Sequence, residues 1–171
     1  DVVAVTVTFN EVVTVTGTPQ LTLETCATDA VVTYTSGSVG TTQTFIYTVA
    51  AGDTNRDLDY DSTNALALNG GTITDVAGNA ATLTLAAPGA TNSLGANKAL
   101  IIDTTVPTIS TVALASNNAT IAVTFAEAVY TTTGASTALI VGDFALSISG
   151  GTATLSSATP SSISSSGNVY T

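Results

Sequence analysis

The sequence lacks several side chains on which enzymes and nucleic-acid-binding proteins depend. It contains no histidine, methionine or tryptophan, and a single cysteine, Cys26. Without histidine or a second cysteine, the chain has neither a set of zinc ligands nor a Ser-His or Cys-His catalytic dyad. Arg56 and Lys98 are its two cations, against twelve acids, and the net charge is −10. Such a chain cannot neutralise a phosphate backbone, which excludes nucleic acid as a partner.

Charged residues are also scarce, at 8% of the 171 residues, yet the composition is that of a folded protein. Disordered chains combine low hydrophobicity with high charge, whereas 44% of this chain is apolar. No apolar stretch approaches the roughly 18 residues that a membrane span needs, so we predict no membrane span. Cys26 lies near Leu23 and is predicted to be a small buried apolar residue rather than a reactive thiol.

The apolar residues alternate with small or polar ones. Val3, Val5, Val7 and Phe9 point one way while the residues between them point the other, which is the period of a half-buried β-strand. Similar alternation recurs at 21–23, 32–34, 45–49, 81–85, 100–102 and 109–113. Glycine, proline and asparagine between these segments mark turns. Many short strands with regular turn signals predict an all-β fold made of antiparallel β-sandwiches.

An internal repeat relates segment 5–13 to segment 121–129, at an offset of 116 residues. The identical pairs are Val7 and Val123, Thr8 and Thr124, Phe9 and Phe125, Glu11 and Glu127, and Val13 and Val129. A repeat length near about 100 residues is typical of one sandwich domain. We therefore predict two tandem Ig-like domains, 1–103 and 108–171, joined by a short linker, 104–107, that Pro107 stiffens.

The repeat also predicts that both domains are incomplete at the chain ends. The second domain has a strand candidate, 109–113, ahead of the shared motif, and the first domain has no counterpart of it. Fewer residues follow Phe125 than separate Phe9 from Asp103. The missing strands are expected to come either from more of the same polypeptide or from a neighbouring subunit that donates a strand.

Several segments resemble bacterial Ig-like repeats. These segments are 5–23, 45–53, 57–60, the turn 75–79 with the sequence Asp-Val-Ala-Gly-Asn, and the linker 102–107 with the sequence Ile-Asp-Thr-Thr-Val-Pro. The resemblance covers nearly all of the first domain, and segments 144–151 and 168–171 of the second resemble a related Ig-like variety. It implies a cadherin-like sandwich, often with calcium, in a long secreted or surface-anchored bacterial protein, many of which are adhesins.

Four acids crowd into one short segment: Asp53, Asp57, Asp59 and Asp61. On an extended segment, a spacing of two places Asp57, Asp59 and Asp61 on one face. Carboxylates this close repel one another unless they are screened, and Ca²⁺ prefers hard oxygen ligands. The glycine and glutamate of an EF-hand loop are absent from the required positions. The segment is therefore either a solvated acidic loop or a calcium site.

A second candidate calcium site lies at the junction of the two domains. Glu11 follows the shared strand, Glu127 is its counterpart, and Asp103 opens the linker. In the cadherin-like arrays that the sequence resembles, such acids meet at domain boundaries, where an ion neutralises them. The simpler alternative is that each acid occupies a turn and accepts hydrogen bonds from backbone amides.

These observations predict a non-catalytic spacer or adhesion repeat of a large extracellular bacterial surface protein, with neighbouring repeats or identical subunits as partners. Two carboxylates can hydrolyse glycosides, but the chain has no tryptophan to line a sugar cleft, so we predict no enzyme activity. The first alternative is a subunit of an extracellular filament, sheath or surface layer, because scarce lysine leaves strand edges unprotected. The second alternative is a carbohydrate-binding module, which the few aromatic residues disfavour.

Overall fold

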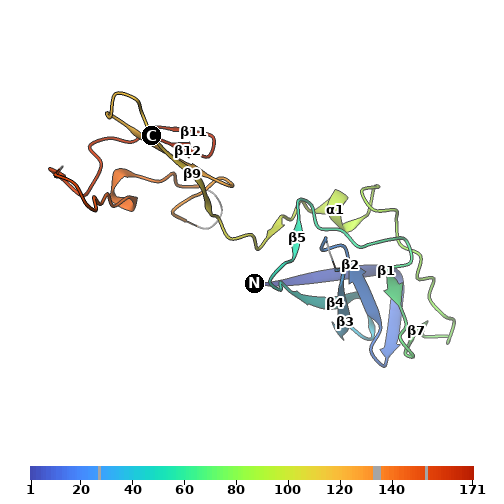
Figure 1. Cartoon of the computed structure of the whole chain (residues 1–171). Coiled ribbons are helices and arrows are strands. Elements are labelled where there is room, and N and C mark those ends of the chain that lie inside the picture. Colours follow the sequence, from blue (N-terminus) through green and yellow to red (C-terminus); the bar gives the residue numbers. More distant parts are fainter. Residues whose placement is uncertain (27, 133–135, 153) are drawn as a thin grey trace. The chain divides into compact units, whose positions relative to one another are not determined.

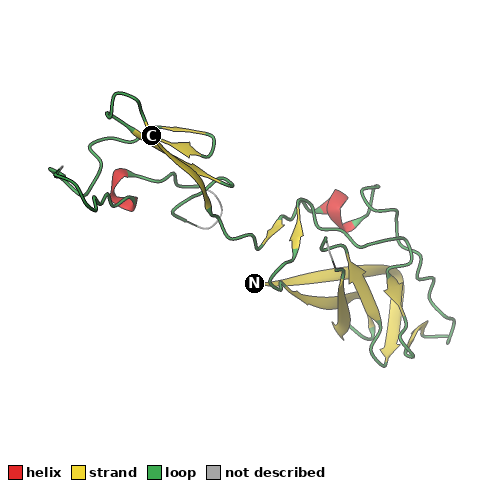
Figure 2. Cartoon of the chain, in the orientation of Figure 1, coloured by secondary structure: helices red, strands yellow, loops and turns green. Residues whose placement is uncertain are grey.

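The computed structural model of the chain describes residues 1–26, 28–132, 136–152 and 154–171. These residues form two compact units, Asp1–Thr105 and Val106–Thr171, and the division falls within segment 104–107. Strands and loops dominate both units (Figure 2). Every ladder in the described part of the chain is antiparallel, which confirms the predicted all-β antiparallel class. In that same part, no helix is long and apolar enough to cross a membrane.

Six strands of the first unit form one sheet, in the order β6-β2-β3-β4-β1-β7. Figure 1 labels β1, β2, β3, β4 and β7 of this sheet. A separate two-stranded sheet pairs β5 with β8. The elements are β1 (Val2–Thr16), β2 (Gln20–Leu23), β3 (Ala30–Ser36), β4 (Gly40–Thr48), β5 (Thr54–Asn55), β6 (Leu66–Ala67), β7 (Thr72–Asp75), the short helix α1 (Leu94–Asn97) and β8 (Ile102–Asp103).

Strand β1 changes partners along its length. Residues 2–8 pair with β4, whereas residues 13–16 pair with β7. The register with β4 shifts between these two parts, because Thr8 lies opposite Thr42 but Val13 lies opposite Gly40. Extra residues of this kind bend a strand and increase its twist, so one strand can serve two ladders.

The core of the first unit follows the alternation of the strands. Val5 of β1, Leu21 of β2, and Phe45 and Tyr47 of β4 are at most 4% exposed and belong to one cluster. Leu58, in the segment after β5, belongs to the same cluster. Full burial of a large apolar side chain contributes about 1.5–3 kcal/mol, so these residues supply much of the stability of the unit.

The second unit is a smaller sheet in the order β11-β12-β10-β9. Its elements are β9 (Ile109–Leu114), β10 (Ile121–Phe125), the 3-10 turn η1 (Val141–Asp143), β11 (Ser165–Ser166) and β12 (Val169–Tyr170). Among its described residues, the buried apolar side chains are Val129 and Tyr170. The unit therefore has strand pairing with little core.

Two sequence-based predictions about the first unit are wrong. Segment 81–85 alternates like a strand, but it forms none, because Leu83 and Leu85 pack against the core while their segment makes isolated hydrogen bonds to Ile73 and Thr63. Cys26 is exposed rather than buried. It follows the end of β2 in a turn with a φ of 81°, so the strand alternation that buries Leu23 does not extend to it.

Candidate functional site

Asp59 is the most enclosed of the predicted metal-binding acids, with 8% of its surface exposed. Its carboxylate accepts hydrogen bonds from the backbone N–H groups of Tyr60 (2.9 Å), Leu94 (3.1 Å) and Gly89 (3.0 Å). Burial raises the pKa of this carboxyl group, but hydrogen bonds from Gly89, Ser93 and Tyr60 outweigh burial and leave the pKa below its ordinary value. Asp59 is therefore held as a carboxylate by amide donors.

The same contacts attach the loop around α1 to the core. The Ser93 hydroxyl caps α1 by accepting from the Ala96 N–H at 3.1 Å, and Ser93 itself is fully buried. The Tyr60 hydroxyl donates to the Ala86 carbonyl at 2.7 Å. The side chains of Ser93 and Tyr60 thus have hydrogen-bond partners in the loop around α1. These bonds hold the loop in place, although it forms no strand ladder.

Asp53 closes the turn that follows β4. Its Oδ2 accepts from the Tyr47 hydroxyl at 2.7 Å and from the Ala50 N–H at 2.8 Å. The hydrogen bond from Tyr47 lowers the pKa of Asp53 below its ordinary value, and the hydrogen bond from the Ala50 N–H lowers it further. Burial, followed by the bond to Asp53, raises the pKa of Tyr47. Asp53 thus links a turn to a core tyrosine.

All but one of the remaining predicted metal-binding acids belong to the first unit, and the other belongs to the second. Asp61 and Glu11 are exposed, the latter in the irregular part of β1. Asp103 is exposed on β8 and accepts from the Thr105 N–H at 2.9 Å, and this bond lowers its pKa. Glu127 belongs to the second unit, where its Oε1 is buried and makes no hydrogen bond within the described residues.

The structure brings two of these acids together at the start of α1. A Cβ built on Gly95 would lie 3.0 Å from Asp59 Oδ2 and 3.4 Å from Asp57 Oδ2, so both carboxylates face Gly95. Asp57 and Asp59 thus share a side, as predicted, but the three acids differ in burial, because Asp59 is held by its amide donors while Asp57 and Asp61 are exposed. Across the described residues, no three acids or cysteines gather closely enough to hold a metal ion.

Gln43 is a buried polar residue that the sequence-based reasoning did not identify. It is 1% exposed, and its Nε2 donates to the carbonyls of Gly37 (3.1 Å) and Gly40 (2.8 Å). These bonds fasten the turn between β3 and β4, where Gly37 has a φ of 118° and no room for a Cβ beside Thr42. The sequence could have predicted this burial. Gln43, Phe45 and Tyr47 lie two residues apart in an alternating strand, so their side chains are on the same face.

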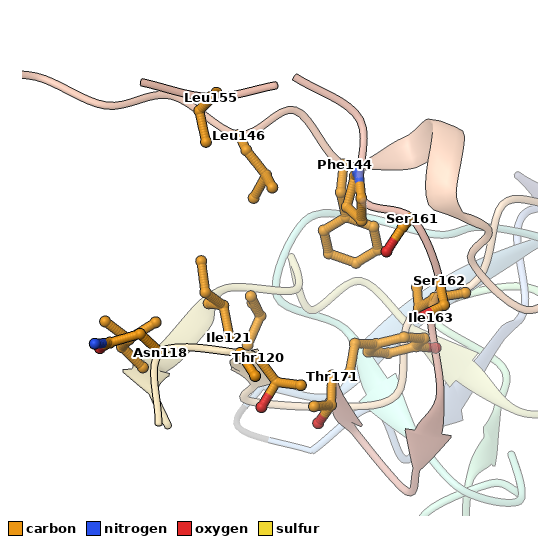
Figure 3. Close-up of a pocket in the computed structure, with 15 residues that line it drawn as sticks. Asn118, Thr120, Ile121, Phe144, Leu146, Leu155, Ser161, Ser162, Ile163 and Thr171 are labelled. Carbon is orange, nitrogen blue, oxygen red and sulfur yellow. The ribbon is translucent and has the colours of Figure 1, made fainter. Parts of the chain in front are cut away.

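The second unit contains an open apolar groove of about 320 Å³. Ile121 and Val123 of β10 line one side, and Phe144, Leu146 and Leu155 line the other. Figure 3 shows Leu146 and Leu155 directed toward Ile121 across this space. Tyr170 closes one end, with its ring centroid 5.8 Å from that of Phe125 and 6.0 Å from that of Phe144. The groove lies on the face of β10 that corresponds to the core face of β1.

Comparison of the chain with protein-family models, curated proteins and solved structures gave no match. The resemblance to bacterial Ig-like repeats therefore stays a prediction that rests on the sequence segments themselves.

Proposed function

We propose that the chain is a non-catalytic structural segment of an extracellular bacterial surface protein, in which its two units serve as tandem spacer repeats. Their partners are neighbouring repeats of the same protein or identical subunits. In this proposal the acids serve the fold, as Asp53 and Asp59 do by ordering loops. Any bound calcium would add rigidity to those loops.

One observation supports the proposal more than any other: the two units share a strand plan. Val7 of β1 lies opposite Gln43 of β4, and the equivalent Val123 of β10 lies opposite Tyr170 of β12. β3 then pairs with β4 as β11 pairs with β12. Repetition of one β module along a chain is typical of proteins whose length and spacing matter.

Single-molecule force spectroscopy of the full chain, held between two handles, tests the spacer role. We expect a discrete unfolding event whose length gain matches residues 1–105 at roughly 3.5 Å per residue, because ladders hold both β1 and β8. If the chain extended under force without a discrete unfolding event, the proposed spacer role would be wrong. Saturable binding on a glycan array would favour the carbohydrate-binding alternative, and antibody labelling of intact source cells tests the extracellular location.

A further inference from the structure

The turn between β6 and β7 contains the one Asn-Gly pair of the sequence, Asn69-Gly70. Both residues have a positive φ, of 46° and 76°, and the Gly71 N–H donates to the Leu68 carbonyl at 2.8 Å. These are the features of a type I′ turn, for which Asn-Gly is a preferred pair. Asn69 and Gly70 are both exposed, so water reaches the side-chain amide and the peptide bond that follows it.

The backbone nitrogen of Gly70 is unhindered. Its N–H donates to no acceptor within the described residues, and a Cβ built on Gly70 would meet no atom within 4 Å. The Asn69 side chain is held at one end, because its Nδ2 donates to the Thr18 carbonyl at 3.2 Å. This hydrogen bond is exposed and joins two neutral groups, so it restrains the side chain only weakly. The side-chain amide carbon and the next backbone nitrogen can therefore meet without unfolding of the unit.

We propose that Asn69 is a site of spontaneous deamidation in the folded chain. The Gly70 nitrogen forms a bond to Asn69 Cγ, the Cγ–Nδ2 bond breaks, and Nδ2 leaves as ammonia with the proton that the Gly70 nitrogen loses. Water then opens the resulting succinimide ring. Attack at Cγ gives aspartate, and attack at the backbone carbonyl carbon gives isoaspartate. Both products add one carboxylate, neither needs an oxidant or an enzyme, and the inference does not depend on the spacer role.

The two products should differ in their effect, because the turn packs tightly against the end of β1. A Cβ built on Gly17 would lie 2.8 Å from the Gly71 Cα, and a Cβ built on Gly71 would overlap the Thr16 carbonyl oxygen. Aspartate keeps the main chain unchanged and loses only the donor to Thr18. Isoaspartate adds a carbon to the main chain where the packing leaves no space. It therefore displaces the start of β7, where Thr72 lies opposite Thr16.

The test incubates the folded wild-type chain at mildly alkaline pH, below its melting temperature, and follows each asparagine by peptide mass spectrometry. Asn118 is the internal control, because it is exposed and has a similar φ of 58°, but the following N–H, of Ala119, donates to Asn117 Oδ1 at 3.0 Å. We expect Asn69 to react at least about tenfold faster than Asn118, because that hydrogen bond must first break. The rate should rise with pH, since the deprotonated nitrogen is the nucleophile. Reaction only in the denatured chain, or equal rates at the two sites, would overturn the proposal.

Hydrogen exchange on the separated products tests the effect on the fold. Chromatography resolves the aspartate and isoaspartate forms of the aged chain, and Asn69→Asp supplies the first form directly. In the isoaspartate form, the amides of β7 should exchange faster than in Asn69→Asp, while those of β4 paired with residues 2–8 should be unchanged. Asn69→Gln should stay unmodified over the same period, because its attack would have to close a larger ring. Equal exchange of the β7 amides in the two forms would show that the turn has room for the longer main chain, and the proposed displacement would be wrong.

Discussion

The two units place the same strand motif in different surroundings. Val5 of β1 is 4% exposed, whereas its equivalent in β10, Ile121, is 39% exposed. In the first unit, side chains of β2, of β3 and of the segment around Leu58 belong to the same buried cluster as Val5. The second unit leaves the corresponding face as an open groove. Alternation therefore selects which side chains face inward, but a second layer of chain is needed to bury them.

The largest expected loss of stability follows a substitution in the core of the first unit, for which the second unit has little equivalent. Phe45→Ala should destabilise the first unit by about 3–5 kcal/mol, because a fully buried ring leaves a cavity. The neighbouring Ile46→Ala is the matched control, since Ile46 points the other way and is 36% exposed. Residue-resolved hydrogen exchange in denaturant measures both. Equal losses for the two variants would contradict the assignment of the inward face.

Removal of the Asp59 carboxylate should have the next largest effect. Asp59→Ala leaves the N–H groups of Tyr60, Gly89 and Leu94 without this acceptor, at a cost of about 3 kcal/mol. Asp61→Ala should change stability by less than about 0.5 kcal/mol, because Asp61 is exposed. Chemical denaturation monitored by tyrosine fluorescence distinguishes them. If Asp61→Ala proved the more damaging, the loop-anchoring role of Asp59 would be wrong.

Equivalent truncations in the two units sharpen the comparison directly. Val5→Ala removes buried carbon and should lower the stability of the first unit by about 2 kcal/mol. Ile121→Ala removes more carbon from a more exposed site and should cost about 1 kcal/mol or less in the second unit. Each is measured from the exchange rates of its own strand. A larger loss at Ile121 would mean that the groove of the second unit is covered in solution.

Acid should weaken the first unit through its carboxylates. The pKa values of Asp53, Asp59, Asp75 and Asp103 are all lowered in the folded state. A lowered folded-state pKa contributes stability that is present above the unfolded value of about 3.9 and is lost as the pH falls through the folded value. We expect thermal unfolding of the first unit to be level near neutrality and to shift to lower temperature below about pH 4. Asp59→Asn should reduce the shift of the melting temperature with pH, because the variant lacks one of these carboxylates.

Calcium should have the smallest effect. Two carboxylates, of Asp57 and Asp59, converge near Gly95. An ion present at its dissociation constant stabilises the folded state by about 0.4 kcal/mol, so chelation at low salt should lower the melting temperature of the first unit slightly. Asp57→Asn should abolish that response. Melting curves that coincide with and without chelator would reject a calcium site in this chain.

The sequence predicted the parts of the fold that depend on local pattern. Alternation at Val3, Val5, Val7 and Phe9 placed one face of β1 correctly, and the repeat identified β10 as its counterpart. The predictions that were wrong concern features that depend on contacts between segments distant in the sequence. Asp59 is buried because amides 30 and 35 residues later surround it, and spacing within its own segment carries no record of them. Segment 81–85 alternates, yet no ladder forms along its length.

The change of partner along β1 bears on how the chain folds during synthesis. Thr16 pairs with Thr72, 56 residues later, and residues 2–8 pair with β4, the third strand after β1 along the chain. At roughly 5–20 residues per second, the valine-rich β1 waits for several seconds before β7 has left the ribosome. Leu114 and Ile121, by contrast, pair across a short turn, so β9 and β10 can form a hairpin as soon as they emerge. The unit with the stronger core thus has the slower start and the longer exposure to chaperones and to misassembly with nascent copies of itself.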